Sequence, residues 1–181
     1  MRKLTASFFI SLDGVVEAPE TWHFPYFNDE MGAVIGASIA ASDAFLLGRR
    51  TYEEWAAFWP HQDPSANPMA AAINGMPKFV ASRTLAEASW ENSTVLADGL
   101  AAEVARLRDQ PGKEIAISGS ATLVRSLMAD ALLDELRLMV HPVVVGRGAR
   151  LFQNGGGPAF ELVHSETFGT GVLNLTYRPA R

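Results

Sequence analysis

The chain contains 181 residues and has a mass of 19.6 kDa, the usual size of one domain. Hydrophobic residues make up 48% and charged residues 19%, so we expect a globular core, and no apolar run approaches the ~18 residues of a membrane-spanning helix. The net charge of −5 disfavours a nucleic-acid-binding protein. The absence of cysteine excludes disulfides, thiolate metal sites and a cysteine nucleophile.

The N-terminal segment is the first predicted strand. Arg2 and Lys3 precede an apolar stretch, as they would in a signal peptide. That stretch runs into Asp13 and Gly14 without a small-residue cleavage site, which is typical of a strand followed by a turn. We therefore expect a cytoplasmic protein.

Strand-like and helix-like segments alternate over the first two thirds of the chain. We expect strands over residues 4–10, 44–47, 78–81, 94–97 and 114–118. Thr51 and Glu54 match a capping box, which predicts that a helix begins at Thr51. The expected helices run from Asn28 or Asp29 to Ala41, from Thr51 to Trp59, near 69–74, and over 100–108 and 121–128.

The last third consists of strands only, predicted over residues 135–145, 159–167 and 172–177 and joined by glycine-rich turns. Parallel strands need long crossover connections, whereas antiparallel strands need only turns. The order therefore predicts an α/β fold with a mainly parallel central sheet, helices on both faces and an antiparallel C-terminal edge. We expect one domain over residues 1–181.

The common nucleotide-binding and hydrolase fingerprints are absent. The sequence contains no G-x-x-x-x-G-K-[ST], no G-x-G-x-x-G after a strand and no G-x-S-x-G. The four histidines have no partner three or four residues away, so we expect no metal site.

Three loops that follow predicted strands carry small, hydroxyl-bearing or arginine residues. The carboxyl ends of parallel strands meet at one edge of a sheet, where ligands bind. Helix N-termini there offer N–H groups and arginine adds charge-assisted hydrogen bonds, so the pattern favours a ligand with several phosphates. Each loop alone also fits an ordinary capped turn. The candidate cofactor-binding residues are Gly48, Arg49, Arg50, Thr51, Ser82, Arg83, Thr84, Gly119, Ser120, Ala121 and Thr122.

Several motifs occur in an order and at a spacing that match a known family. They are Ser11-Leu12-Asp13-Gly14, Leu47-Gly48-Arg49-Arg50-Thr51-Tyr52, Val80-Ala81-Ser82-Arg83-Thr84, Ile117-Ser118-Gly119-Ser120-Ala121, Asp134-Glu135-Leu136, and Pro142-Val143-Val144-Val145-Gly146-Arg147-Gly148 through Leu151-Phe152. The sequence resembles the dihydrofolate-reductase fold family, and more closely its bacterial branch similar to the C-terminal reductase domain of riboflavin biosynthesis. The resemblance covers nearly the whole chain.

The resemblance implies an NADPH-dependent reductase that acts on a small pyrimidine- or pteridine-like substrate and forms a homodimer. In that family the loops matching residues 48–51 and 119–122 hold phosphates, and the loop matching residues 82–84 faces the adenosine 2′-phosphate. The region matching residues 11–16 flanks the nicotinamide and the substrate. Arginines near the adenosine end favour NADPH over NADH.

One feature departs from dihydrofolate reductases, which place a carboxylate just after a Trp-x-x-Pro stretch. Here Trp22-His23-Phe24-Pro25 matches that stretch, but Phe27 stands where counting from Pro25 places the acid. The nearest acids are Asp29 and Glu30. We therefore expect weak or no reduction of dihydrofolate.

The loop with Trp22, Phe24, Tyr26 and Phe27 is the candidate substrate wall, because its aromatic rings would form a dry surface over a planar ring. Ordinary core packing of a long loop is the alternative. Asp13 is the candidate catalytic residue: it would bond an aminopyrimidine, or supply a proton if burial raised its pKa. The alternative for Asp13 is an Asp-Gly turn after the first strand.

Other functions stay open beside the reductase. The same fold would suit a nucleotide-binding module without turnover, a transferase that uses a phosphorylated sugar, or a true dihydrofolate reductase. A preference for the 2′-phosphate favours a reductase, whereas a binding module need not oxidise NADPH with any acceptor.

Overall fold

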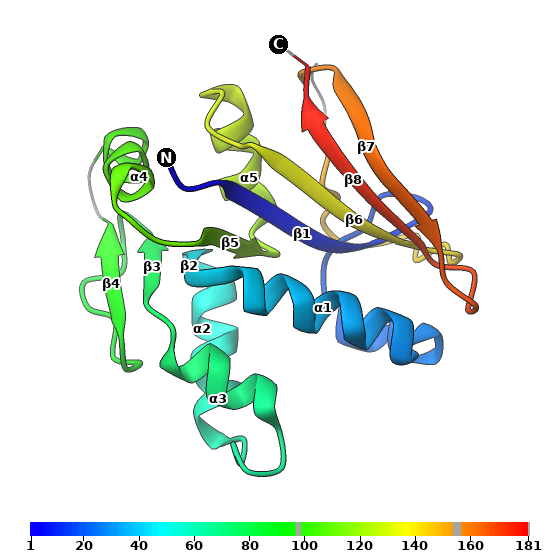
Figure 1. Cartoon of the computed structure of the whole chain (residues 1–181), viewed down its shortest axis with the longest axis horizontal. Coiled ribbons are helices and arrows are strands. Elements are labelled where there is room, and N and C mark those ends of the chain that lie inside the picture. The colour runs from blue at the N-terminus through cyan, green and yellow to red at the C-terminus, as the bar shows by residue number, and fades with distance from the viewer. Residues whose placement is uncertain (97–98, 154–156, 181) are drawn as a thin grey trace.

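Eight strands form one sheet in the computed structural model, which describes residues 1–96, 99–153 and 157–180. The order across the sheet is β4-β3-β2-β5-β1-β6-β8-β7, which differs from the order along the chain (Figure 1). The strands are β1 (Leu4–Ser11), β2 (Ser42–Gly48), β3 (Lys78–Ala81), β4 (Ser93–Leu96), β5 (Glu114–Ser118), β6 (Glu135–His141), β7 (Phe160–Thr167) and β8 (Leu173–Pro179).

The pairing of the strands confirms the predicted fold class. All neighbours from β4 to β6 pair in parallel, whereas β8 pairs antiparallel with both β6 and β7. Parallel neighbours end at the same edge of a sheet. The loops that follow β1, β2, β3 and β5 therefore lie along one edge.

Helices cover both faces of the sheet. The first three, α1 (Asp29–Ala41), α2 (Arg49–Phe58) and α3 (Pro68–Gly75), lie on one face, and α4 (Leu100–Asp109) and α5 (Ala121–Ala129) lie on the other (Figure 1). Successive residues of a strand point to opposite faces, so each face has its own core. In β2, Leu46 belongs to the core under α4 and α5, whereas Phe45 and Leu47 belong to the core under α2 and α3.

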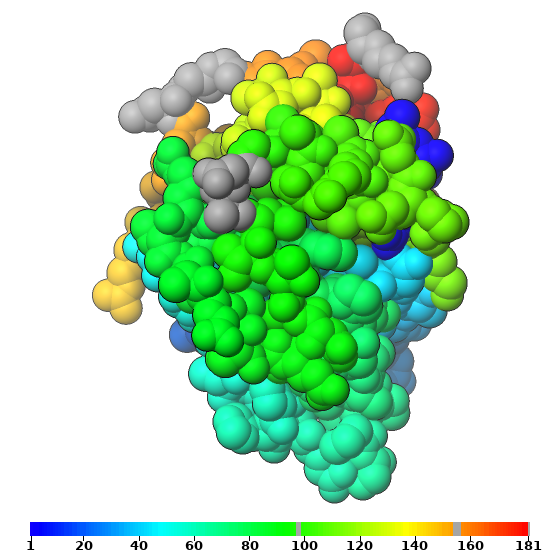
Figure 2. Space-filling model, turned by 90° about the vertical axis from the view of Figure 1, so that its left-hand side faces the viewer, coloured from blue at the N-terminus to red at the C-terminus, as the bar shows by residue number. Residues whose placement is uncertain are grey.

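The two ends of the sheet differ in how well they are covered. Figure 2 faces the β4 end, where the residues around β4 and α4 (green) cover much of the surface. At the other end, every residue of β7 except the first is exposed. In the described ranges, no helix combines the length and the apolar character that crossing a membrane requires.

Two predicted boundaries are wrong. The helix expected from Thr51 begins at Arg49 and has Gly48 as its N-cap, without any side-chain cap. The strand expected to reach residue 145 ends at His141, because the segment that follows bonds to the loop after β1, with the Leu12 amide donating to the Val143 carbonyl (2.9 Å). The strand expected over 94–97 ends at Leu96, and residue 97 lies outside the described residues.

Lys78 is a fully buried lysine at the start of β3. Its ammonium donates to the carbonyls of Ile73 (3.1 Å), Asn74 (2.8 Å) and Met76 (2.9 Å), and it lies 4.2 Å from the centre of a Trp90 ring. These carbonyls at the end of α3 carry partial negative charge and have no partner within the helix. Burial lowers the pKa of Lys78 to about 8, so the group is still mostly charged at pH 7.

Replacing Lys78 by Met keeps the apolar stem but removes the ammonium donor from the carbonyls of Ile73, Asn74 and Met76. We expect Lys78→Met to lower the free energy of unfolding by about 2–3 kcal/mol, the order of a lost hydrogen bond to a charged group. Thermal unfolding measures this loss. Lys113→Met is the control, because the Lys113 ammonium meets a single carbonyl, that of Ala40, at the surface. Equal melting temperatures for the two variants would contradict the role of Lys78.

Candidate functional site

The N-termini of α2 and α5 meet at the carboxyl edge of the sheet. They follow β2 and β5, which are neighbours in the sheet. The Ser120 hydroxyl accepts a hydrogen bond from the Gly48 amide (2.9 Å) and donates one to Thr51 Oγ1 (2.9 Å). The structure therefore brings two of the three predicted loops into direct contact.

Small residues line the contact between these two loops. A Cβ on Gly48 would lie 3.4 Å from Ser120 Cβ, and one on Gly119 would lie 3.5 Å from Thr51 Oγ1, both ordinary van der Waals distances, so space alone does not exclude a side chain. Gly119 and Ser120 both have left-handed backbone conformations, with φ of 62° and 60°. The first N–H groups of α2 and α5 have no partner within their helices, and helix N-termini attract anions. This edge is therefore suited to a phosphate-bearing ligand.

The third loop lies beside the other two. Gly48 at the end of β2 pairs with Ala81 at the end of β3, so residues 82–84 leave the sheet next to the start of α2. Ser82 shapes this loop by accepting hydrogen bonds from the amides of Thr84 (3.2 Å) and Leu85 (2.9 Å). The structure thus places all three predicted loops along one stretch of the sheet edge.

The remaining residues predicted to bind a cofactor lie on the surface of the same three loops. Arg49, Arg50 and Arg83 are exposed. Arg49 forms an ion pair with Glu53 in the next turn of α2 (2.9 Å). Thr122 is also exposed and accepts a hydrogen bond from Arg125 (3.0 Å), whereas Ala121 is half-buried.

Asp13 holds together two loops of the same edge. Its carboxylate accepts hydrogen bonds from the Ser11 hydroxyl (2.6 Å) and from the amides of Val145 (3.0 Å) and Gly146 (2.8 Å). The hydrogen bond from Ser11, with those from the two amides, lowers the pKa of Asp13 to about 2. Asp13 is therefore ionised at neutral pH, so the condition for a proton-donating role, a pKa raised by burial, is not met. The contacts favour the turn-shaping interpretation.

The segment 142–153 also belongs to this edge. In the sequence it was singled out only as a motif of the resembling family and not as part of a site. Arg150 Nε donates to the Asp13 carbonyl (2.9 Å), and Arg125 donates to the carbonyls of Arg150 (3.1 Å) and Leu151 (3.0 Å). Next to these contacts, a hollow of about 330 Å³ is lined by Gly148, Arg150, Phe152 and Gln153. Gly146 and Gly148, both of which have positive φ, are the sequence feature that indicates a tightly turned loop here.

The aromatic loop contains two short 3₁₀ turns, over Pro19–Thr21 and Phe24–Tyr26. Its candidate substrate residues do not share one surface. Trp22 is buried and donates from Nε1 to the Glu17 carbonyl (3.1 Å), whereas the side chains of Phe24 and Phe27 are 63% and 47% exposed. The rings that close over the sheet are those of Trp22, His23 and Tyr26, which lie around His141.

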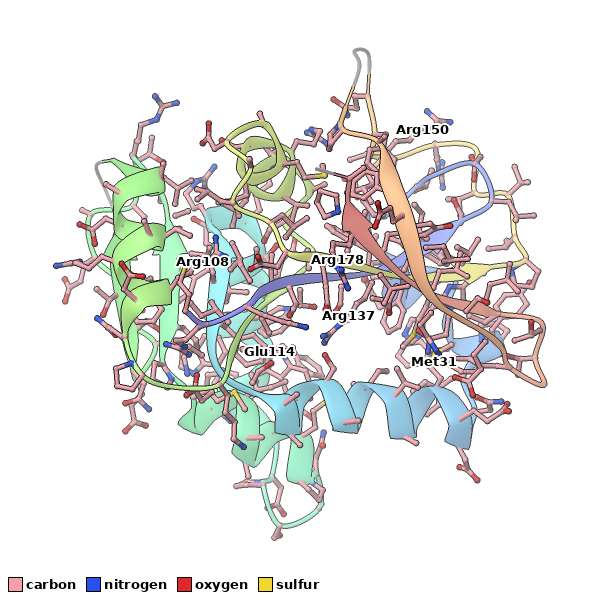
Figure 3. All side chains as sticks on the ribbon, turned by 45° about the horizontal axis from the view of Figure 1, so that its top comes forward. Met31, Arg108, Glu114, Arg137, Arg150 and Arg178 are labelled. Atoms are coloured by element: carbon pink, nitrogen blue, oxygen red, sulfur yellow. The ribbon has the colours of Figure 1, made fainter. Side chains whose placement is uncertain are left out.

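The start of α1 presents no acid toward the sheet. Asn28 caps the helix by accepting from the Met31 amide (3.0 Å), and Asp29 is exposed in the first turn. Glu30 accepts from the amide of Gly169 in the β7–β8 turn (2.7 Å). The fully buried residue of α1 is Met31, which points toward the sheet (Figure 3). As expected from the sequence, the start of α1 therefore lacks the inward-facing carboxylate of dihydrofolate reductases.

An ionic network lies between the sheet and α1, where Figure 3 labels Glu114 and Arg137. Arg137 donates to Glu114 (3.2 Å) and Glu135 (2.8 Å), and Lys3 donates to Glu135 (2.6 Å). Burial raises the pKa of Glu135, but the hydrogen bonds from Lys3 and Arg137 outweigh it and lower the pKa overall. The carboxylate of Glu135 is therefore held ionised, and the network connects β5, β6 and the residue before β1.

Replacing Asp13 by Asn introduces an N–H donor opposite the amides of residues 145 and 146, so we expect Asp13→Asn to lower the melting temperature at pH 7. A carboxylate whose pKa is lowered on folding stabilises the protein above its unfolded pKa of about 3.8, and this contribution disappears as the pH falls toward about 2. The difference between variant and wild type should therefore narrow below pH 3.8.

Thermal unfolding between pH 3 and pH 7 measures this difference. Asp109→Asn, at the exposed end of α4, is the control. NADPH oxidation is assayed on the same samples. A wild-type melting temperature combined with lost turnover would contradict the turn-shaping role and make Asp13 a catalytic residue.

Comparison with known proteins finds a family and relatives that this chain resembles. The family model described as RibD C-terminal domain matches residues 2–174. The chain is 29% identical over 182 residues to the uncharacterized protein YyaP of Bacillus subtilis (strain 168), covering 97% of this chain and 94% of that protein.

Solved structures show the same fold. A putative riboflavin biosynthesis protein from Shewanella sp. PV-4 has a TM-score of 0.80 at 21% identity, over 99% of each chain. A deaminase/5-amino-6-(5-phosphoribosylamino)uracil reductase from Thermotoga maritima has a TM-score of 0.68 at 11% identity, over 99% of this chain and 57% of that one. Dihydrofolate reductase from Enterococcus faecalis, complexed with NADP(H) and RAB-propyl, has a TM-score of 0.64 at 15% identity, over 99% of this chain and 97% of that one.

The predicted resemblance to the dihydrofolate-reductase fold and to its riboflavin-biosynthesis branch is thus confirmed. Since the family model covers nearly the whole length, the chain belongs to the RibD C-terminal domain family.

Proposed function

We propose that this protein is an NADPH-dependent reductase that transfers hydride to a small pyrimidine- or pteridine-like heterocycle. The observation that carries the proposal is the contact between the first turns of α2 and α5 through Ser120. Two helix N-termini at one sheet edge form a site for a pyrophosphate. The family and the reductases among the structural neighbours support the same reading.

The residues of this edge fit a dinucleotide phosphate. Gly119 and Ser120 adopt left-handed backbone conformations immediately before α5, a geometry that glycine takes without strain. The exposed Arg83 stands on the neighbouring loop, at the distance of one strand from α2. A guanidinium binds a phosphate through two parallel hydrogen bonds, so Arg49, Arg50 and Arg83 would recognise an additional 2′-phosphate. The ion pair of Arg49 with Glu53 is exposed, so Arg49 can leave Glu53 for a phosphate at little cost in free energy.

NADPH, when bound, supplies the hydride. The acceptor is a polarised double bond such as C=N, whose carbon gains the hydride and whose nitrogen gains a proton, so that C–H and N–H bonds form and NADP⁺ remains. The chain positions the acceptor and excludes water. We assign the proton to solvent, because Asp13 is held ionised and Asp29 and Glu30 do not face the sheet. This arrangement disfavours dihydrofolate as the acceptor.

We expect the protein to bind NADPH more tightly than NADH by about 1–3 kcal/mol, the scale of charge-assisted hydrogen bonds. Arg49→Ala and Arg83→Ala should each reduce this preference without changing the melting temperature. Titration of each variant with both nucleotides, followed by fluorescence, measures the preference. Arg106→Ala, which removes an exposed arginine of α4, is the control. Equal affinity of the wild type for both nucleotides would refute the role of these loops.

A binding module without turnover is the second candidate, because the closed aromatic loop leaves little access to β1. A screen of heterocyclic acceptors, followed by NADPH absorbance, separates the two functions. Oxidation with any acceptor supports the reductase, whereas NADPH binding without oxidation across pyrimidines and pteridines supports the binding module.

We also propose that two copies associate through β7. This edge strand exposes Leu162 (55%) and Val163 (48%), and β8 exposes Leu173, which pairs with Thr167 at the other end of β7. An exposed edge strand with apolar side chains is a template for pairing with another strand, and a second copy offers the same edge about a two-fold axis.

Light scattering at micromolar concentration should therefore give the mass of two chains. Leu162→Glu should convert the protein to a monomer, because it places a charge within the apolar interface. Val144→Glu is the matched control, since Val144 is exposed on a loop away from β7. A wild-type mass of one chain would disprove the association.

A further inference from the structure

His141 lies in a box of four aromatic rings at the end of β6. The centre of its ring is 5.3 Å from Trp22, 5.6 Å from Phe9, 5.8 Å from Tyr26 and 6.1 Å from His23, and it is close to perpendicular to each of them. Phe9 comes from β1, and the other three rings come from the aromatic loop. His141 itself is fully buried.

The box contains a hydrogen-bond acceptor without a donor. Nδ1 of His141 lies 2.8 Å from the Met139 carbonyl, so this nitrogen carries the proton and Nε2 presents a lone pair. Nε2 is buried and has no partner within the described residues. Burial lowers the pKa of His141, which keeps the ring neutral.

Other polar atoms without partners gather at the same end of the molecule. Across the described ranges, the buried side-chain nitrogen and oxygen atoms without a hydrogen bond are His23 Nδ1, His141 Nε2 and Thr170 Oγ1. Thr170 lies in the β7–β8 turn, where a Cβ on the next residue, Gly171, would be 3.7 Å from Cγ of Pro142. Buried polar atoms are rarely left unsatisfied in native proteins, so a cluster of them indicates a polar occupant.

His23 shows which kind of molecule fits this space. Its imidazole stacks on Phe9, with ring centres 4.5 Å apart and planes inclined by 10°. The face of Phe9 therefore already accepts a planar nitrogen heterocycle. A ring that took the place of His23 on Phe9 would turn an edge toward His141, which lies beside the stack and not within it.

The segment that carries His23 makes few hydrogen bonds to the rest of the protein, although its rings pack against the sheet. The backbone hydrogen bonds of residues 18–27 that the structure describes stay within the segment. Its side-chain bonds to other parts of the chain are Trp22 to the Glu17 carbonyl (3.1 Å) and Tyr26 to the Pro142 carbonyl (3.5 Å). Trp22 and His23 are buried, so opening the segment breaks few hydrogen bonds but exposes these two rings, and a planar ring that stacks on Phe9 offsets part of that cost.

We propose that His141 recognises the N–H edge of the hydride-accepting heterocycle, which stacks on Phe9 after displacing residues 18–27. This inference rests on the proposed function and names a specificity-determining residue for it. The position is suitable, because β1 alone separates β6 from β5, so these two strands lie about 10 Å apart across the sheet. Ser7 pairs with both Ser118 and Arg137, whereas His141 pairs with Ser11, so the box also lies further along the strands than the Gly119 turn. A dinucleotide held at that turn is long enough to reach the box.

Titration with 5,6-diaminouracil in the presence of NADPH tests the proposal. This probe is a planar pyrimidine with several N–H donors, and 1,3-dimethyluracil, which has none, is the control ligand. In protein with ¹⁵N-labelled histidine, the Nε2 resonance of His141 should move on addition of 5,6-diaminouracil and stay in place with 1,3-dimethyluracil. A bridging water alone would give no such movement, and this result would overturn the proposal.

His141→Phe is the decisive variant, because it fills the box with an apolar ring of similar size. Removing an unsatisfied polar atom should leave the melting temperature near that of the wild type, and NADPH affinity should not change. The affinity for 5,6-diaminouracil should fall about tenfold or more. His141→Gln, which keeps an acceptor, should retain part of the affinity, and His61→Phe, at an exposed position, should retain all of it.

Two results separate this inference from the proposed function. Unchanged affinity of His141→Phe for 5,6-diaminouracil, with NADPH still bound, would overturn the role of His141 alone. Failure of the wild type to bind NADPH would overturn the proposed reductase, and the role of His141 toward a hydride acceptor with it. If His141→Phe does not fold, His141→Gln provides the test, because it keeps a hydrogen-bond acceptor at this position. Complete loss of 5,6-diaminouracil affinity in His141→Gln would overturn the proposal that His141 acts as a hydrogen-bond acceptor.

Discussion

The hydroxyl of Ser120 joins the first turns of two helices that come from different parts of the chain. It accepts a hydrogen bond from Gly48 at the start of α2 and donates one to Thr51 in the same turn, while Ser120 itself precedes α5. This contact depends on the adjacency of β2 and β5 and on the left-handed backbone conformations of Gly119 and Ser120. The position of the candidate phosphate site follows from it, since both helix N-termini then face the same edge.

The loops around this edge are fixed by carboxylates and guanidinium groups that accept or donate to the backbone. Asp13 accepts from the amides of Val145 and Gly146, and Arg150 donates to the Asp13 carbonyl. Such contacts give a rigid rim to a sheet edge that would otherwise consist of separate loops. They also explain why Asp13 is ionised: three hydrogen bonds stabilise its charged form.

The end of the sheet at β6 has the opposite character. The polar atoms of His23 and His141 are buried among aromatic rings and lack partners, although most other buried polar groups in the described ranges are satisfied. An unsatisfied buried nitrogen destabilises the protein, and such groups concentrate at functional sites. In the proposed function these two regions are parts of one site: the edge at α2 and α5 would hold a long anionic cofactor, and the aromatic segment would give way to a planar ring.

Local patterns were enough to predict the elements of the fold and the loops at its strand ends. Apolar periodicity, glycine turns and capping residues act over a few neighbours, so the strands, the helices and the loops at 48–51, 82–84 and 119–122 were predictable. Which polar groups meet follows only from the three-dimensional fold. Asp13 meets the amides of residues 145 and 146, and His23 meets His141, because the pairing of β1 with β6 brings distant segments together. Burial and pKa depend on such long-range contacts, which leave no local signal in the chain.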